Sequence, residues 1–194
     1  GERGDGGEDW LPRISGDSIM FCDLAGRGRP EEFTIKDRYN NIWAYDSHLN
    51  QLWSYTGNIG HYARSYDIDG DGREEVYACD AMLDHDGRML WRVDLHDHCD
   101  SMIIGEIDSQ PGLDVLFANS DGGFYILDAL TGDIKKEWHL GHCQSVTFGN
   151  FREDMKQPQI IGTTGWGGGY WFLFDRDLNL KQADFKPSRG DTPV

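Results

Sequence analysis

Four carboxylates stand at positions 1, 3, 5 and 9 of one short segment, the run DIDGDGREE. They belong to Asp67, Asp69, Asp71 and Glu75. The glycines between them permit a sharp turn that would bring these oxygens around one ion, to which Arg73 could add its backbone carbonyl. Oxygen ligands on a flexible loop suit Ca²⁺ better than Mg²⁺, and the spacing is not that of an EF-hand. We therefore expect a calcium site here. The alternative is an acidic turn that holds no ion.

Histidines gather in three connecting segments. His98 and His142 take the same place in two of them, each followed by cysteine, one further residue and serine, and His61 lies near that place in an earlier segment. Imidazole titrates near neutral pH and can transfer protons, while the guanidinium of Arg64 can bind a carboxylate. We therefore predict a catalytic group made of His61, Arg64, His98 and His142.

Two other interpretations of these histidines stay open. They could tie one structural unit to the next through hydrogen bonds and take no part in chemistry. They could also hold a transition metal together with Cys99 and Cys143, although the short ligand spacing that is typical of zinc sites is missing.

Several further residues are suited to contact with a sugar. Tyr62 and Asp100 stand beside the predicted catalytic residues, and Trp166 and Tyr170 enclose three glycines. Aromatic rings can stack on a pyranose, and glycines would let that loop adapt. We predict that these four residues bind substrate. For the aromatic pair the alternative is the start of a buried strand.

The elements that must position these residues repeat along the chain. Apolar strands and polar turns follow in the same order four times, at intervals of roughly 40–45 residues, as one four-stranded blade of a β-propeller requires. A polar residue closes the first strand of each repeat, and an aspartate closes the third: Asp23, Asp67, Glu106 and Asn150, then Asp46, Asp84, Asp128 and Asp175. We predict an all-β chain with four blades of four antiparallel strands, near residues 17–58, 62–96, 99–140 and 143–184. No strand is left over to close a small ring, which favours part of a larger ring.

The blades differ in two local features. The last strand carries a tryptophan in the first three blades, at Trp53, Trp91 and Trp138. The turn that carries the calcium motif in the second blade is degenerate elsewhere. Basic residues replace the ligands in the first blade, a Pro-Gly pair tightens the turn of the third, and the fourth has lost the pattern.

Composition narrows the choice of partners. The 18 basic residues stand against 34 acidic ones, for a formal net charge of −16. Binding to nucleic acid requires a basic face, so nucleic acid and an anionic membrane surface are not expected as partners. No apolar run approaches the ~18 residues of a spanning helix, no signal peptide is recognisable, and four cysteines indicate no disulfide framework.

The sequence resembles the propeller-type rhamnogalacturonan lyases and related calcium-loop propellers with FG-GAP/VCBS-like repeats. The similarity covers roughly residues 60 to 140. It rests on the run HCDSMIIGEIDSQPGLDV, which begins at His98, and on YDIDGDGREEV followed by LDHDGRMLW in the preceding blade. The first blade lacks a calcium loop, and the fourth carries the Trp166-Gly-Gly-Gly-Tyr170 segment in place of the family's pattern.

This resemblance implies a secreted or cell-surface, carbohydrate-active propeller that contains Ca²⁺ and cleaves a uronate-containing polysaccharide by β-elimination. That reaction needs a group that neutralises the uronate carboxylate, a base for the C5 proton and an acid for the leaving oxygen. Arg64, Lys36, Tyr62 and the connecting histidines are suitable residue types. The alternative is a non-catalytic, calcium-stabilised propeller that binds carbohydrate or protein.

Overall fold

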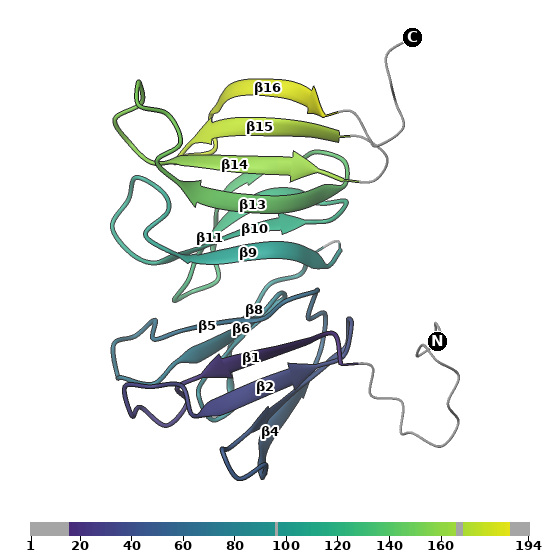
Figure 1. The fold of residues 1–194 in the computed structure, drawn as a ribbon, viewed down its shortest axis with the longest axis vertical. Helices are drawn as coiled ribbons and strands as arrows, with labels where there is room; N and C mark the ends of the chain where they lie inside the picture. The colour runs from purple at the N-terminus through teal and green to yellow at the C-terminus, as the bar shows by residue number, and fades with distance from the viewer. Residues whose placement is uncertain (1–15, 96, 166–168, 187–194) are drawn as a thin grey trace, which may run out of the picture. The chain divides into compact units, whose positions relative to one another are not determined.

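A computed structural model describes residues 16–95, 97–165 and 169–186, and these residues form four sheets (Figure 1). The first two sheets contain β1 (Ser18–Cys22), β2 (Glu32–Lys36), β3 (Asn41–Tyr45) and β4 (Gln51–Thr56), then β5 (Arg64–Tyr66), β6 (Glu75–Ala78), β7 (Ala81–Leu83) and β8 (Met89–Arg92). The other two contain β9 (Cys99–Gly105), β10 (Asp114–Asn119), β11 (Gly123–Asp128) and β12 (Ile134–Trp138), then β13 (Cys143–Gly149), β14 (Gln159–Thr164), β15 (Gly169–Asp175) and β16 (Leu180–Lys186).

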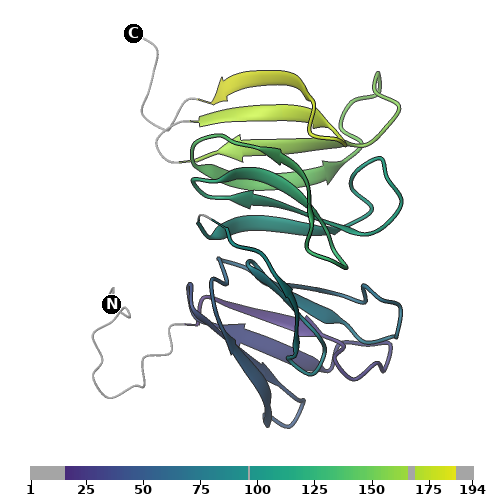
Figure 2. The same ribbon diagram turned by 180° about the vertical axis from the view of Figure 1, so that it is seen from behind.

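Each sheet joins its four strands in chain order, as an antiparallel meander does. No helix occurs within the described ranges, so none of these residues belongs to a helix that could span a bilayer. The predicted fold class, all-β with blades of four antiparallel strands, is therefore confirmed. Figure 2 shows the same meanders from behind.

The chain divides into two compact units, with the boundary inside β8 between Leu90 and Trp91. In the first unit, apolar side chains of the first two blades share one core, which includes Ile42, Ala44 and Val76. Along β3 these buried residues alternate with half-buried ones, as expected where one face of a strand meets the core.

The second unit has an aromatic core between its two sheets. The indole of Trp138 lies 4.9 Å from the ring of Phe174 and 5.1 Å from that of Phe172, both measured between centroids, and Phe124 joins the same cluster. Strand β10 is buried at all six positions. This packing fixes the ends of β9 and β13, where the predicted histidines lie.

The tryptophans of the last strands are not all equivalent. The indole N–H of Trp53 donates to the carbonyl of His85, in the third turn of the next blade, and that of Trp91 donates to the corresponding carbonyl of Ala129. Trp138 instead pairs with Phe124, two places beyond the position of Trp53, and packs in the core. The three tryptophans that recur in the sequence therefore have two different structural roles.

A β-bulge recurs between the third and fourth strands of three blades. The pairing passes from Ala44–Trp53 to Tyr45–Gln51, which leaves Leu52 as the extra residue. Lys135 and Lys181 are the extra residues at the same place in the third and fourth blades. Because a bulge re-aims one side chain, these three residues occupy equivalent and unusual positions.

Candidate functional site

The predicted calcium loop connects β5 to β6 in the first unit. Oxygens of Asp67, Asp69 and Asp71 lie within 4.8 Å of one another. Gly70 and Gly72 have φ angles of +80° and +89°, in the left-handed region that favours glycine. The loop therefore adopts the sharp turn expected from its sequence.

The backbone of this loop is held by its own carboxylates. Asp67 accepts hydrogen bonds from the N–H groups of Gly70 and Gly72. Oδ1 of Asp69 accepts the N–H of Asp71, and Oδ1 of Asp71 accepts the N–H of Arg73. The second oxygens of Asp69 and Asp71 accept no hydrogen bond from any described residue. These two oxygens are available as ligands.

Glu75, the first residue of β6, is 1% exposed. Its Oε2 accepts the N–H of Ile68 at 2.8 Å, but its buried Oε1 has no hydrogen-bond partner among the described residues. Burial, reinforced by the charges of Asp69 and Asp84, raises the pKa of Glu75 to about 7. A buried carboxylate left without a partner is unfavourable, and a cation would satisfy it.

In the third blade, a lysine neutralises the carboxylate at the equivalent place. Asp114 stands at the place of Glu75, and its Oδ2 accepts the N–H of Ile107 at 3.0 Å. The ammonium of Lys135, the bulge residue, lies 2.6 Å from Asp114 Oδ1 and 3.1 Å from Asp108 Oδ2. Burial alone would lower the pKa of Lys135, but the bonds to these two carboxylates raise it above its usual value, so the ammonium stays charged.

The first blade uses an arginine at this place. Glu32, 3% exposed, accepts the N–H of Ala25 through Oε2 and the Nη1–H of Arg27 at 2.9 Å through Oε1. The guanidinium of Arg27 therefore neutralises this carboxylate, which explains the basic residues noted in the first turn.

The fourth blade needs no cation, because its residue at this place is neutral. Gln159 Oε1 accepts the N–H groups of Phe151 and Arg152 at 2.8 and 3.0 Å. Across the four blades, a side-chain oxygen at the start of the second strand always binds the preceding turn. Of the three carboxylates at this place, that of Glu75 alone makes no ion pair in the described part of the chain, and the nearest ring nitrogen, from His85, lies within 4.8 Å of it. This comparison favours a bound cation in the second blade.

In the second unit, the structure brings His98, Asp100 and His142 together. Nε2 of His98 lies 3.7 Å from Asp100 Oδ1, and Nε2 of His142 lies 4.0 Å from Asp100 Oδ2. The amide of Gln144 donates to Asp100 Oδ1 at 3.0 Å. The Asp100 side chain is only 2% exposed, whereas the two imidazoles are 21% and 27% exposed. Two partly accessible imidazoles thus flank one buried carboxylate.

Carboxylates also orient both rings from the other side. Nδ1 of His98 lies 2.6 Å from Asp97 Oδ1, and Nδ1 of His142 lies 3.1 Å from Asp121 Oδ1. Burial alone would raise the pKa of Asp97, but hydrogen bonds from the backbone and ring of His98 hold it below its usual value. An ionised carboxylate only accepts, so Nδ1 of His98 carries the proton, and in the neutral ring Nε2 presents its lone pair toward Asp100.

One of the cysteines beside these histidines has a hydrogen-bond partner of its own. Cys143 is fully buried, and its thiol donates to the carbonyl of Gly141. Burial, with the nearby charges of Asp100 and Asp121, raises the pKa of Cys143 to about 12. That this thiol binds a transition metal together with the histidines stays a prediction.

The remaining predicted residues of this group lie in the first unit. Nδ1 of His61 is 3.4 Å from Asp17 Oδ2, and its ring makes an edge contact with Tyr39. The guanidinium of Arg64 lies 5.8 Å from the centre of the Tyr62 ring, and the side chain of Tyr62 is 48% exposed. Arg64 and Tyr62 thus form an accessible pair. That these residues act with His98 and His142 stays a prediction.

Lys36 is buried, whereas Tyr170 of the predicted sugar-stacking loop is exposed. Lys36 is 1% exposed, and its ammonium donates to the carbonyls of Arg38 and His61. It is therefore placed to hold the His61 backbone and cannot readily meet a ligand. Tyr170 is 51% exposed, with its N–H bonded to Thr164 Oγ1. Trp166 lies outside the described residues.

Sequence reasoning missed the partners of the predicted residues. Asp97, Asp121 and Gln144 support the histidine group, and Lys135 neutralises Asp114 in the third blade. Asp97 precedes His98 directly, and Gln144 follows His142 by two places, so their proximity was visible in the sequence. The contact of Lys135 with Asp114 depends on a bulge and has no short-range signal.

Comparisons with known proteins place this chain in a family. The sequence profile described as rhamnogalacturonan lyase family 11, C-terminal domain, matches residues 32–191. Over 135 residues the chain is 34% identical to rhamnogalacturonan exolyase YesX of Bacillus subtilis (strain 168), covering 67% of this chain and 21% of that protein. Rhamnogalacturonan endolyase YesW of the same strain is 30% identical over 137 residues, covering 68% and 21%.

Solved structures agree in fold. The crystal structure of exotype rhamnogalacturonan lyase YesX superposes with a TM-score of 0.71 at 24% identity, over 86% of this chain and 32% of that one. The chain spans about a fifth of the length of the curated relatives it matches. On the profile match to most of its residues, the chain belongs to rhamnogalacturonan lyase family 11 and corresponds to its C-terminal domain.

Proposed function

We propose that this domain contributes to a polysaccharide lyase that cleaves a uronate-containing polysaccharide by β-elimination. Membership of the family supports this reaction class. The observation that carries the proposal is the pair of imidazoles, each held at Nδ1 by a carboxylate and each with Nε2 facing the buried Asp100.

The residues of this group have the properties that proton transfer requires. In their neutral form, His98 and His142 hold a lone pair at Nε2 and can take the proton from the carbon next to the uronate carboxylate. The carboxylates at Nδ1 stabilise the imidazolium that forms, as carboxylates do in other histidine bases. The other imidazole, in its protonated form, can give the proton at its Nε2 to the leaving oxygen. The guanidinium of Arg64, in the first unit, is of the type that binds a uronate carboxylate, and the exposed rings of Tyr62 and Tyr170 are of the type that stacks on sugar.

We further propose that the second blade binds Ca²⁺ through Asp67, Asp69, Asp71 and Glu75. The oxygens of Asp67, Asp69 and Asp71 lie together, and the unsatisfied Oε1 of Glu75 is a further oxygen ligand of the kind that Ca²⁺ takes, although the carboxylate of Glu75 lies closest to Asp84 and His85. A bound ion would neutralise the loop and tie β5 to β6. The polymer is a macromolecule of plant cell walls, so we also propose that the protein acts outside the cell.

The test is the absorbance of unsaturated uronate at 235 nm. The full-length protein is incubated with rhamnogalacturonan and with a panel of other uronate polymers. We expect His98→Gln and His142→Gln to lower the rate at least 100-fold, because a positioned general base contributes about 10²–10⁴. The control is His48→Gln, since His48 lies on an exposed turn.

Two results would reject the lyase proposal. One is full activity in both histidine variants. The other is tight binding of the polymer with no rise at 235 nm, which would favour the non-catalytic, calcium-stabilised scaffold. The same assay with Arg64→Gln tests the guanidinium. A higher KM with little change in kcat is expected if Arg64 only binds the uronate.

A further inference from the structure

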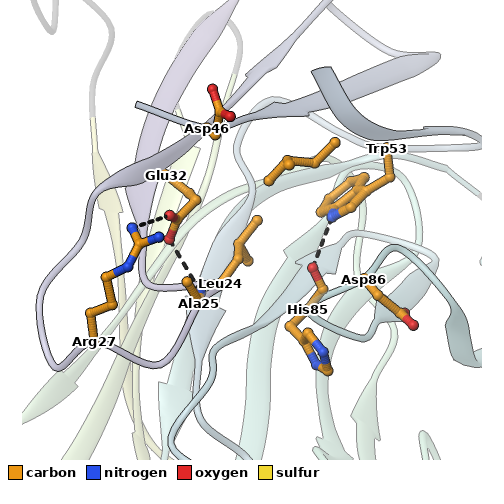
Figure 3. Close-up of a pocket in the computed structure, with 9 residues that line it drawn as sticks. Leu24, Ala25, Arg27, Glu32, Asp46, Trp53, His85 and Asp86 are labelled. Carbon is orange, nitrogen blue, oxygen red and sulfur yellow. Dashed lines mark hydrogen bonds and ion pairs between the residues drawn. The ribbon is translucent and has the colours of Figure 1, made fainter. Parts of the chain in front are cut away.

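The first unit contains a pocket that the proposed reaction does not use. Its volume is about 430 Å³, within the range of small-molecule sites. The first turn and the β3–β4 hairpin of the first blade form one part of its wall, and the β7–β8 turn of the second blade forms another (Figure 3). Leu24, Ala25, Leu52 and Trp53 line it with apolar groups, and Arg27 and Glu32 with polar ones.

The pocket exists because two side chains are smaller here than in the third blade. Ala25 stands where that blade has Asp108, since each donates its N–H to the carboxylate at the start of the second strand. Leu52 is the bulge residue, where that blade has Lys135. The lysine that reaches the carboxylates of the third blade is therefore missing from the first, and its space is open.

The walls combine an apolar floor with a rigid aromatic ring. Leu24 and Trp53 are 4% and 9% exposed, and Leu52 is 48% exposed. The indole is fixed by its hydrogen bond to His85 and by Gly87, whose φ is +84°. A Cβ on Gly87 would lie 2.6 Å from Trp53 Cγ, so the turn approaches the ring as closely as only glycine permits.

Polar groups face each other across this floor. In Figure 3, Arg27 and Glu32 lie on one side, and Trp53 with the His85 carbonyl lies on the other. Arg27 bonds through Nη1 alone, so its Nε and Nη2 donate to no described residue. Asp86 Oδ1 accepts the N–H of Arg88, while its Oδ2 accepts none from the described residues. The pocket thus offers several acceptors and one donor group.

Charge decides among the possible ligands. Three carboxylates, from Glu32, Asp46 and Asp86, outnumber the single guanidinium of Arg27, so an anionic sugar is disfavoured. A small hydrated cation gains nothing from an apolar floor. A neutral pyranose donates its hydroxyls to carboxylates and lays its apolar face on aromatic and aliphatic groups.

We propose that this pocket binds a neutral pyranose unit, separately from any uronate. This proposal depends on the proposed function in one respect only. The sugar would come from the polymer that the lyase cleaves, which also contains neutral residues. The pocket would then hold a neutral unit of the polymer while the charged units remain outside it.

The test uses saturation-transfer NMR on the full-length protein with three probes. These are methyl α-L-rhamnopyranoside, methyl β-D-galactopyranoside and methyl α-D-galactopyranosiduronate. We expect saturation transfer to at least one neutral glycoside, with a Kd on the order of 1 mM, as small uncharged ligands often show. We expect at least tenfold weaker binding of the uronate.

Leu52→Lys is the decisive variant, because it restores the residue type that the third and fourth blades carry at this bulge. Its ammonium would fill the pocket and approach Glu32, so binding should weaken at least tenfold. Leu90→Lys is the matched control, since Leu90 precedes Trp91 as Leu52 precedes Trp53 and is also exposed. If Leu52→Lys lowers the melting temperature, Ala25→Leu fills the same pocket from another wall.

Unchanged binding in the filled variants, or preferential binding of the uronate, would overturn the proposal. The binding measurement is independent of cleavage at 235 nm. If the protein cleaves the polymer but binds no neutral glycoside, only the proposal about the pocket is refuted. If it binds the neutral glycoside at Leu52 but never cleaves the polymer, only the lyase proposal is refuted.

Discussion

Replacing Glu75 by glutamine gives the sharpest test of the cation in the second blade. The change removes a buried negative charge but keeps an oxygen for the N–H of Ile68. The fourth blade shows that this arrangement is stable, since Gln159 binds Phe151 in the same way. We therefore expect the variant to fold, and to lose its need for a cation.

The magnitude follows from the pKa of Glu75, about 7 against an ordinary value of 4.5. Between these values the folded chain holds more protons than the unfolded chain, so without a cation the stability falls as the pH rises. At about 1.36 kcal/mol per pKa unit, the loss by pH 7.5 is roughly 3 kcal/mol. For a chain of this size, that corresponds to roughly 6–12 °C in melting temperature.

The assay is thermal unfolding between pH 4.5 and 7.5, in chelator and in millimolar Ca²⁺. In chelator, the wild type should lose stability across this range, and Glu75→Gln should not. Calcium should raise the melting temperature of the wild type most at high pH, because it binds the ionised form. A flat pH profile of the wild type in chelator, or an equal gain from Ca²⁺ in both proteins, would refute the reasoning.

Three further changes test neighbouring parts of the same argument. Asp69→Ala should abolish the calcium-dependent rise in melting temperature, and calorimetry should then detect no binding to the loop. Lys135→Met leaves two buried carboxylates facing each other and should cost about 3 kcal/mol in urea unfolding, and adding Asp114→Asn should recover part of that loss. Gly87→Ala should destabilise the chain by about 1–3 kcal/mol in the same measurement, because it strains a positive φ and collides with Trp53.

Much of the fold could be predicted from local pattern. Aspartates at turn positions and alternating apolar residues set the strand order, and the antiparallel meanders follow from the short turns between them. The loop from Asp67 to Glu75 was also predictable, because its ligand types, glycines and spacing all lie within nine consecutive residues. Local signals of this kind survive in a single sequence, since no distant contact is needed to interpret them.

The remaining features depend on register. Lys135 and Lys136 are adjacent, and only the bulge between β11 and β12 decides that Lys135 points to Asp114. The equivalence of Trp53 with Trp91, and the different place of Trp138, likewise follow from pairing. A shift of one residue sends a side chain to the other face of a sheet, so composition alone cannot assign these roles.

The four blades together show why a cation is expected in one of them and not in the others. Every blade needs an acceptor at the start of its second strand to hold the preceding turn, and a carboxylate in that buried place must be neutralised. Arg27 and Lys135 supply a tethered charge, Gln159 needs none, and Glu75 has neither solution in the described part of the chain. Tethered charges neutralise a carboxylate at any ion concentration, whereas the cation proposed for the Glu75 loop would make the stability of its blade depend on the ion concentration. Calcium sensitivity of this protein should therefore reside in the second blade.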